Sequence, residues 1–352
     1  MQTGPPTHHP ILEGLIDYAG LFPPASLPLA IAIVEYRGLL DCADAHVLGR
    51  FILPATRLDE ITAFLHLFDR SSPLRLCLLA IPGAHAADIG QSVEYAVATG
   101  ETFVSASEGR VRVDVIETRL TDRELDSPDL IERSLDHAAR ASTPRPLYVE
   151  MPFSRRQQAS FGALGALATA RRAGLTELGA KIRCGGDAPE DVPNPAVVAK
   201  FLYRCLDWGV PFKATAGLHH PVRSVTAEHG PTHGFLNVFA AAVLGHARDL
   251  DEQVLVQILD ETDPEAFSLE SGGISWRGFA ATPVETERAR SAIARSFGSC
   301  SFDEPTSDLR AMGWLGTAPV PGSQTIPGSQ AKPVAAEAVP ASPLPTVKTS
   351  AS

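Results

Sequence analysis

The chain has 352 residues, of which 44% are hydrophobic and 20% charged, and its formal net charge is −11. This length allows two domains or one large one, and the composition is that of a folded protein rather than a disordered one. The acidic balance argues against nucleic acid as a partner, because phosphate binding needs a basic face. The sequence shows neither a secretion signal nor an apolar run of membrane-spanning length, so we expect no membrane partner.

The cysteine pattern indicates a reducing compartment. There are five cysteines, an odd number, and none forms a Cys-x-x-Cys pair. This pattern fits neither a disulfide framework nor a zinc ribbon, and it favours a cytoplasmic location.

The two ends of the chain differ in composition from the part between them. Residues 317–352 consist mostly of Ala, Pro, Ser, Thr, Gly and Val, without an aromatic residue to seed a core. We predict a disordered tail there and a flexible N-terminus over residues 1–10. The catalytic domain is expected to span residues 11–316.

Between these ends, short apolar runs alternate with helical patterns. The runs that predict strands are 15–19, 50–54, 74–81, 111–118, 146–152, 178–183, 210–215 and 274–279. Helical spacing predicts helices near 28–41, 58–68, 86–98, 128–140, 155–173, 195–208, 233–246, 251–260 and 284–297, and residues 100–110 are expected to add a small hairpin. Apolar strands that alternate with helices pair in parallel, because each parallel pair needs a crossover connection.

Eight strand–helix units favour a single (β/α)8 TIM barrel over an open doubly wound sheet. A Gly-x-Gly-x-x-Gly turn after the first strand would favour the open sheet, but the chain has Gly20-Leu21-Phe22-Pro23-Pro24 there. That turn cannot cradle a pyrophosphate. The barrel is therefore the predicted fold.

In a barrel the chemistry gathers at the carboxyl ends of the strands, where the loops that follow them converge. The polar candidates on or just after the predicted strands are Asp17, Arg50, Asp114, Glu117, Glu150, Lys181, Arg183, Lys213, His219 and His220. Alternation along strands six and seven turns Lys181 and Lys213 to the face opposite the helices. Both lysines are therefore expected inside the barrel.

Two interpretations of these lysines stay open. In one, a neighbouring cation lowers the pKa of one of the two lysines, and its neutral amine attacks a carbonyl group to form a Schiff base. In the other, each lysine pairs with a carboxylate such as Glu150 or Asp114 and only stabilises the barrel. Asp17 is either a site acid or the cap of a turn.

The segment Lys213-Ala214-Thr215-Ala216-Gly217-Leu218 resembles the Lys-Ala-Ser-Gly-Gly-Ile run of deoxyribose-phosphate aldolases, which are class I, Schiff-base TIM-barrel enzymes. The resemblance is one of site layout and covers strands four to seven. It implies that Lys181 forms the Schiff base, that Lys213 lowers its pKa, and that Asp114 belongs to the proton relay. No family is recognised for the whole chain.

Strand six continues into Arg183, Gly185 and Gly186. A guanidinium beside a flexible Gly-Gly turn suits a carboxylate or phosphate of the substrate. A turn with a barrel-core salt bridge is the equally weighted alternative.

Histidines give a rival hypothesis. His219, His220, His229 and His233 follow strand seven within 15 residues, and with Glu117 and Glu150 they could bind a divalent metal. However, His-x-His and His-Glu-x-x-His spacings are absent, and adjacent histidines on an extended segment point opposite ways. We therefore expect no bound metal.

The leading hypothesis is a barrel enzyme that needs no cofactor and uses a lysine amine on a small anionic carbonyl or sugar-phosphate-like compound. An aldolase-type or related lyase reaction is expected. The alternatives are a metal-dependent hydrolase or lyase, and a non-catalytic barrel that serves as a binding or scaffold protein. Substrate identity and oligomeric state, including a homo-oligomer, are left open by the sequence.

Overall fold

The computed structural model describes residues 9–316, except 84–87, 187, 227–229 and 270–271. The predicted tail 317–352 and most of the predicted flexible N-terminus lie outside the described residues. His9 belongs to the folded part, because only 9% of its surface is exposed.

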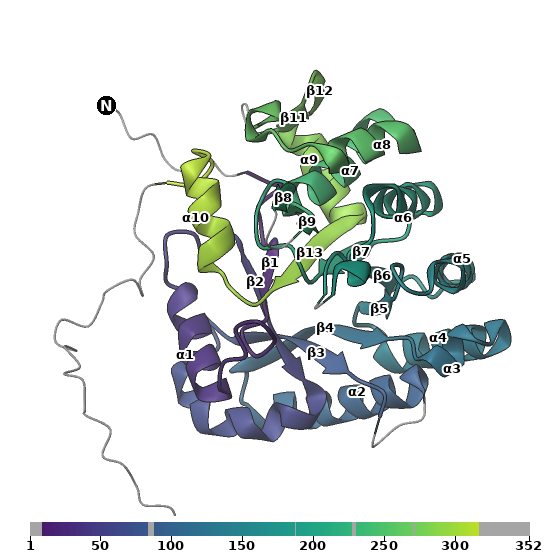
Figure 1. Ribbon diagram of the computed structural model, residues 1–352. Helices are drawn as coiled ribbons and strands as arrows, with labels where there is room; N and C mark the ends of the chain where they lie inside the picture. The colour runs from purple at the N-terminus through teal and green to yellow at the C-terminus, as the bar shows by residue number, and fades with distance from the viewer. Residues whose placement is uncertain (1–8, 84–87, 187, 227–229, 270–271, 317–352) are drawn as a thin grey trace, which may run out of the picture.

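Eight parallel strands close into a barrel in the order β1-β13-β7-β6-β5-β4-β3-β2 (Figure 1). They are β1 (Ile16–Tyr18), β2 (Leu48–Pro54), β3 (Leu74–Ala80), β4 (Val111–Arg119), β5 (Leu147–Met151), β6 (Leu178–Arg183), β7 (Phe212–Thr215) and β13 (Ala294–Ser299). Every neighbouring pair is parallel, as strand–helix alternation requires. The predicted (β/α)8 TIM barrel is confirmed.

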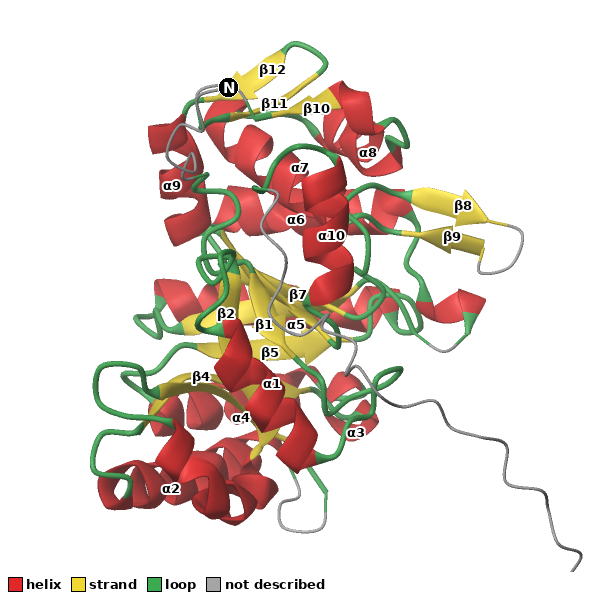
Figure 2. Ribbon diagram, turned by 90° about the vertical axis from the view of Figure 1, so that its left-hand side faces the viewer, coloured by secondary structure: helices red, strands yellow, loops and turns green. Residues whose placement is uncertain are grey.

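Helices cover the outside of the strands (Figure 2). They are α1 (Leu29–Leu39), α2 (Ile89–Ala106), α3 (Asp122–Leu125), α4 (Pro128–Ser142), α5 (Gln157–Arg172), α6 (Pro195–Trp208), α7 (Phe235–Arg248), α8 (Glu252–Asp260), α9 (Pro283–Ala292) and α10 (Asp303–Ala311), with 3-10 turns η1 (Ala55–Leu67), η2 (Pro189–Asp191) and η3 (Pro264–Ala266). The predicted helix near 58–68 is thus a 3-10 segment. No helix among the described residues is long and apolar enough to cross a membrane.

Local signals in the sequence explain why α6 has its predicted bounds. Asn194 precedes the helix, and its side chain accepts a hydrogen bond from the backbone N–H of Val197. Pro195 occupies the first turn, where its missing N–H costs nothing. Gly209 ends the helix with φ of 64°, a left-handed conformation that glycine adopts without strain.

The main apolar core lies between the strands and the helices. Phe212 of β7 packs edge-on against Phe201 of α6 and stacks on Phe239 of α7. A smaller cluster lies inside the barrel and contains Ala19, Ile52, Cys77, Val115 and Tyr148. The strands therefore bury both faces, as parallel strands in a barrel do.

The eighth barrel strand is not the one predicted. Residues 274–279 instead contribute β11 (Ile274–Trp276) to an antiparallel sheet with β10 (Phe267–Ser268) and β12 (Phe279–Ala281). Arg277 and Gly278 both have positive φ and form the hairpin turn. The barrel closes with β13, which begins inside the segment predicted as helix 284–297, because α9 ends at Ala292.

Two smaller differences concern loops. Residues 100–110 form no hairpin, since α2 continues to Ala106. The connection after β7 holds an antiparallel ribbon, β8 (Ser224–Thr226) with β9 (Gly230–Thr232).

Candidate active site

Lys181 and Lys213 lie side by side inside the barrel. They are directly paired in the parallel register of β6 and β7. Their neighbours Ile182 and Phe212 belong to the outer core against the helices, so the two lysines face inward. Their side chains are 8% and 1% exposed, respectively. Two buried cations at this spacing repel each other strongly unless carboxylates lie between them.

Glu117 of β4 supplies the carboxylate that both lysines share. Its Oε2 lies 2.7 Å from Lys181 Nζ, and its Oε1 forms an ion pair with Lys213 Nζ. Burial raises the pKa of Glu117, but the two ammonium groups outweigh burial and hold the pKa well below its ordinary value. Glu117 is therefore an ionised counterion of both lysines at neutral pH.

Lys213 is the deeper of the two lysines. Its Nζ lies 2.7 Å from Asp17 Oδ2 and 3.7 Å from Cys77 Sγ, and 5.7 Å from the centre of the Tyr148 ring. Burial disfavours the ammonium form, yet Asp17 and the other acidic neighbours raise the pKa of Lys213 well above its ordinary value. Lys213 is thus a fixed cation of the core.

Asp17 is held in place by more than Lys213. Its Oδ2 accepts a hydrogen bond of 2.7 Å from Ser296 Oγ, and its Oδ1 accepts one of 2.6 Å from the backbone N–H of Arg50. The Asp17 side chain is fully buried, and burial raises its pKa, but Lys213 and Arg50 together lower it below its usual value. Asp17 is therefore a buried anion of the barrel and not the cap of a turn.

Lys181 lies nearer to the carboxyl-terminal mouth of the barrel. Its Nζ is 3.0 Å from Glu150 Oε2 on β5, and Glu150 Oε1 is 3.3 Å from Arg183 Nη1. Exposure rises along this line, from 1% for the Glu117 side chain to 12% for Glu150 and 44% for Arg183. The Lys181–Glu150 pair thus lies between the fully buried Glu117 and the solvent-exposed Arg183.

The expected depression of the Lys181 pKa is wrong. Burial and the Lys213 charge do lower it, but the attraction of Glu117 and Glu150 is larger, and the pKa is raised. The resting side chain is therefore an ammonium ion. A neutral amine at this position requires transfer of a proton to a neighbouring carboxylate.

Asp114 does not contact either lysine, contrary to its expected place beside them. Its carboxylate lies 2.8 Å from Arg75 Nε, 3.3 Å from Arg112 Nη2 and 3.7 Å from Arg50 Nε. A bulge explains this position, because Leu76 and Cys77 of β3 pair with Val113 and Val115, respectively, so that Asp114 is the extra residue. The β4 acid that reaches both lysines is Glu117.

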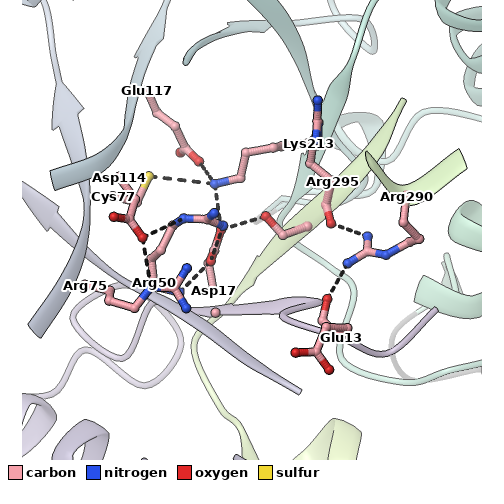
Figure 3. A network of polar contacts seen from close by, with 12 residues as sticks. Glu13, Asp17, Arg50, Arg75, Cys77, Asp114, Glu117, Lys213, Arg290 and Arg295 are labelled. Carbon is pink, nitrogen blue, oxygen red and sulfur yellow. Dashed lines mark hydrogen bonds and ion pairs between the residues drawn. The ribbon is translucent and has the colours of Figure 1, made fainter. Parts of the chain in front are cut away.

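These contacts join into one chain of alternating charges through the barrel. From the amino-terminal to the carboxyl-terminal mouth, the order is Arg75, Asp114, Arg50, Asp17, Lys213, Glu117, Lys181, Glu150 and Arg183. Figure 3 shows the amino-terminal part of this chain of charges, from Arg75 to Glu117. Each buried charge has an opposite charge on both sides, which is the condition for burying ions without large cost.

The predicted glycine turn is a packing device. A Cβ on Gly185 would lie 2.7 Å from the Cα of Gly217 in the loop after β7, so the two loops approach closely there. Gly217 itself has φ of +69°. A Cβ on Gly186 would meet Asp191. The glycines therefore set the shape of the mouth beside Arg183.

The histidines do not converge on the glutamates. His219 Nδ1 lies 3.0 Å from Glu304 Oε2, and His220 Nδ1 lies 2.7 Å from Asp308 Oδ2, both on α10. His233 is buried, with its Nε2 2.6 Å from the carbonyl oxygen of Pro193. His229 lies outside the described residues. Within the described ranges, no group of three or more His, Cys, Asp or Glu side chains is arranged to hold a metal ion.

Sequence reasoning missed several residues near this network. Cys77 and Tyr148 approach Lys213 from β3 and β5, and Ser296 binds Asp17 from β13. Alternation of side chains along β3 and β5 could have placed the first two inside the barrel. Ser296 could not be placed inside the barrel from the sequence, because helical spacing predicts a helix over residues 284–297.

The sequence matches no family model and no curated protein. Among solved structures, the fold is similar to a Toxoplasma gondii ME49 protein described as a "putative deoxyribose-phosphate aldolase". The two chains are 11% identical, the match covers 86% of this chain and 93% of the other, and the TM-score is 0.46. The barrel assignment depends on the strand topology of this chain itself.

Proposed function

We propose that this protein is a barrel enzyme that uses the amine of Lys181 as a nucleophile on a small anionic carbonyl compound. The reaction class is carbon–carbon bond cleavage or formation, or a related dehydration. One observation carries the proposal. A lysine at the carboxyl end of β6 has an ionised, partly exposed carboxylate, that of Glu150, 3.0 Å from its Nζ.

The rarity of lysine in this chain supports a specific need for an amine. The sequence contains five lysines among 30 basic residues, so arginine is the usual cation. Two of the five, Lys181 and Lys213, are inside the barrel. A guanidinium can make the same ion pairs but cannot form an imine, and it is too large for many buried positions.

The chemistry begins with a proton transfer. The Lys181 ammonium gives a proton to Glu150, and the neutral amine adds to the carbonyl carbon of the substrate to form a carbinolamine. Glu150, now protonated, returns its proton to the departing hydroxyl, and water leaves as the iminium forms. The iminium then accepts the electron pair of the breaking carbon–carbon bond, while a base takes the proton of the β-hydroxyl group.

Glu150 suits the role of proton carrier better than Glu117 does. Glu117 forms ion pairs with both lysine ammonium groups, and its side chain is 1% exposed. Glu150 touches Lys181 and Arg183 and is 12% exposed, so a substrate at the mouth can reach it. Lys181 and Arg183 hold the pKa of Glu150 below its ordinary value, so that the group starts as the proton acceptor.

Arg183 is proposed to bind the anionic group of the substrate. Its side chain follows Lys181 on the same face of β6 and is 44% exposed. Only one of its nitrogen atoms approaches Glu150, at 3.3 Å. The remaining donors suit a carboxylate or phosphate.

Borohydride trapping tests this proposal. The protein is incubated with a panel of aldehydes, keto acids and sugar phosphates, reduced with borohydride, digested and mapped by mass spectrometry. We expect an adduct on Lys181 in the wild type and none in Lys181→Arg. Lys200→Arg on α6 is the matched control, because Lys200 lies over the Phe161 ring outside the barrel.

The outcomes separate the proposal from a non-catalytic barrel. An adduct on Lys181 that forms with only one class of carbonyl compound supports the enzyme. No adduct with any compound, or equal labelling of all five lysines, contradicts it. The alternating charge chain would then serve to stabilise the barrel alone.

A further inference from the structure

A cavity opens at the mouth of the barrel opposite the proposed active site. Its volume is about 510 Å³, and it is lined by Arg50, Arg75, Tyr148, Lys213, Arg290 and Arg295, among others. Arg75 and Arg295 are the second residues of β3 and β13, and Pro146, which also lines it, precedes β5. The cavity therefore lies at the amino-terminal ends of the strands.

Two arginines in this cavity form no ion pair with a carboxylate of the residues that the structure describes. Arg295 forms no hydrogen bond or ion pair through its side chain with any described residue, and its Nε is buried. Among the described residues, the Arg290 side chain donates only to backbone carbonyl oxygens. Figure 3 shows the contacts with Glu13, at 2.7 Å, and with Arg295, and the third acceptor is Ala294, at 2.7 Å. The buried Nε of Arg290 has no partner within the described part of the chain.

The carboxylates nearby do not cancel these charges. The Asp114 carboxylate already forms ion pairs with Arg75 and Arg50. Glu287 is exposed on α9, and the effect of Glu13 on the pKa of Arg290 is smaller than that of Asp17. Burial and the adjacent Arg295 lower the pKa of Arg290 to about 9, which shows how poorly the pair is compensated.

Uncompensated guanidinium groups beside an open cavity favour an anion there, because a bound anion removes their repulsion and the cost of burial. We propose that the cavity at the amino-terminal mouth binds a small phosphorylated compound, with its phosphate on Arg290 and Arg295. Guanidinium groups suit phosphate because several of their N–H donors can engage its oxygens together. The volume exceeds that of a phosphate ion and lies within the range for small-molecule sites, roughly 300–1,000 Å³.

This site is separate from the proposed active site. Lys213 and Asp17 fill the barrel between the cavity and Lys181, and Arg183 lies at the other mouth. Substitution of Arg295 therefore tests the cavity, and substitution of Arg183 tests the carboxyl-terminal mouth, independently of each other.

Calorimetric titration with inorganic phosphate and with a panel of phosphate monoesters tests the proposal. We expect saturable binding to the wild type and binding about tenfold or more weaker to Arg295→Gln, since hydrogen bonds to charged groups are lost. Arg288→Gln, which removes an exposed cation of α9, should bind as the wild type does. Arg183→Gln should keep the binding at this cavity and lose only anion binding at the carboxyl-terminal mouth. In phosphate-free buffer, Arg295→Gln should melt no lower than the wild type, because it removes an uncompensated charge.

Three results would overturn the inference. The first is no binding of phosphate or any monoester at millimolar concentration. The second is binding lost in Arg183→Gln but kept in Arg295→Gln, which would place the anion at the carboxyl-terminal mouth. The third is equal weakening by Arg288→Gln, which would indicate unspecific attraction. If Arg295→Gln fails to fold, Arg295→Lys keeps the charge, and its binding should still fall below that of the wild type.

Discussion

The ammonium groups of Lys181 and Lys213 share one carboxylate, that of Glu117, between directly paired positions of β6 and β7. This bridge allows two cations to be buried side by side. It also means that the charge of each lysine affects the other through a common partner. The proposed reaction therefore depends on how the proton of Lys181 is divided between its own nitrogen atom and Glu150.

Replacing Lys181 should separate its chemical role from its structural one. Lys181→Arg keeps a cation between Glu117 and Glu150, so we expect a folded protein without a borohydride adduct. Lys181→Met removes the cation and leaves buried carboxylates less compensated, which should reduce the free energy of unfolding by about 3 kcal/mol. Urea denaturation at neutral pH measures this change. A Lys181→Met protein as stable as the wild type would contradict the ion-pair geometry.

Replacing Lys213 should raise the pH at which Lys181 reacts. The Lys213 charge lowers the pKa of Lys181, although the carboxylates dominate. In Lys213→Leu that repulsion is lost and Glu117 attracts Lys181 alone, so the pKa of Lys181 rises further. We expect the rate of trapping to reach its maximum at higher pH than in the wild type. Lys200 lies outside the barrel, so Lys200→Leu should leave the pH dependence of the trapping rate unchanged. A shift of the maximum to lower pH in Lys213→Leu would refute the argument.

The free energy of unfolding of Lys213→Leu should also fall, by about 3–5 kcal/mol, because Asp17 and Glu117 lose a buried partner. If this variant does not fold, Lys213→Arg keeps the charge and allows the pH profile to be measured.

The sequence predicts most of the barrel because buried parallel strands read as apolar runs. β6, Leu178–Arg183, is such a run, interrupted only where Lys181 and Arg183 face inward. The segment that forms β13, Ala294–Ser299, is not an apolar run, because it includes Arg295 and Ser296. These two side chains belong to the polar interior of the barrel. The strand forms through its pairing with β1 and β7, which no local pattern reveals.

The place of Asp114 could not be predicted for a related reason. Its position depends on the bulge between β3 and β4, and a bulge is a property of the register between two strands. Alternation counted along β4 alone cannot detect the extra residue. Glu117, beyond the bulge, was recognised as a site candidate but not as the shared partner of the two lysines.

The contrast between Glu117 and Asp114 gives a direct test of the β4 assignment. Glu117→Gln removes the carboxylate that bridges Lys181 and Lys213, so adduct formation should slow by roughly 10²-fold or more if proton transfer at Lys181 depends on this network. Asp114→Asn alters contacts with Arg75, Arg112 and Arg50 but with neither lysine, and its trapping rate should stay close to that of the wild type. Single-turnover trapping with the best carbonyl compound gives both rates. The opposite order would restore Asp114 as the relay acid.

Acid should destabilise the protein through its buried carboxylates. The pKa values of Asp17, Glu117 and Glu150 are lowered in the folded state by their cationic partners. Unfolded carboxyl groups titrate near pH 4, so the unfolded chain takes up protons first as the pH falls. The stability that these groups contribute is complete above about pH 5 and is lost as the pH falls through their folded pKa values.

Glu150→Gln tests this linkage at a single group. Its side chain is 12% exposed, so the substitution leaves an amide that still fits beside Lys181 and Arg183. The variant should be less stable than the wild type at pH 7, and the difference should shrink as the pH falls below about 5, because the Glu150 carboxyl group takes up a proton first in the unfolded chain and at lower pH in the folded protein. Glu132→Gln on the exposed face of α4 should follow the wild-type curve. Urea unfolding at four pH values from 7 to 3 gives both curves, and a difference independent of pH would show that Glu150 does not act through its charge.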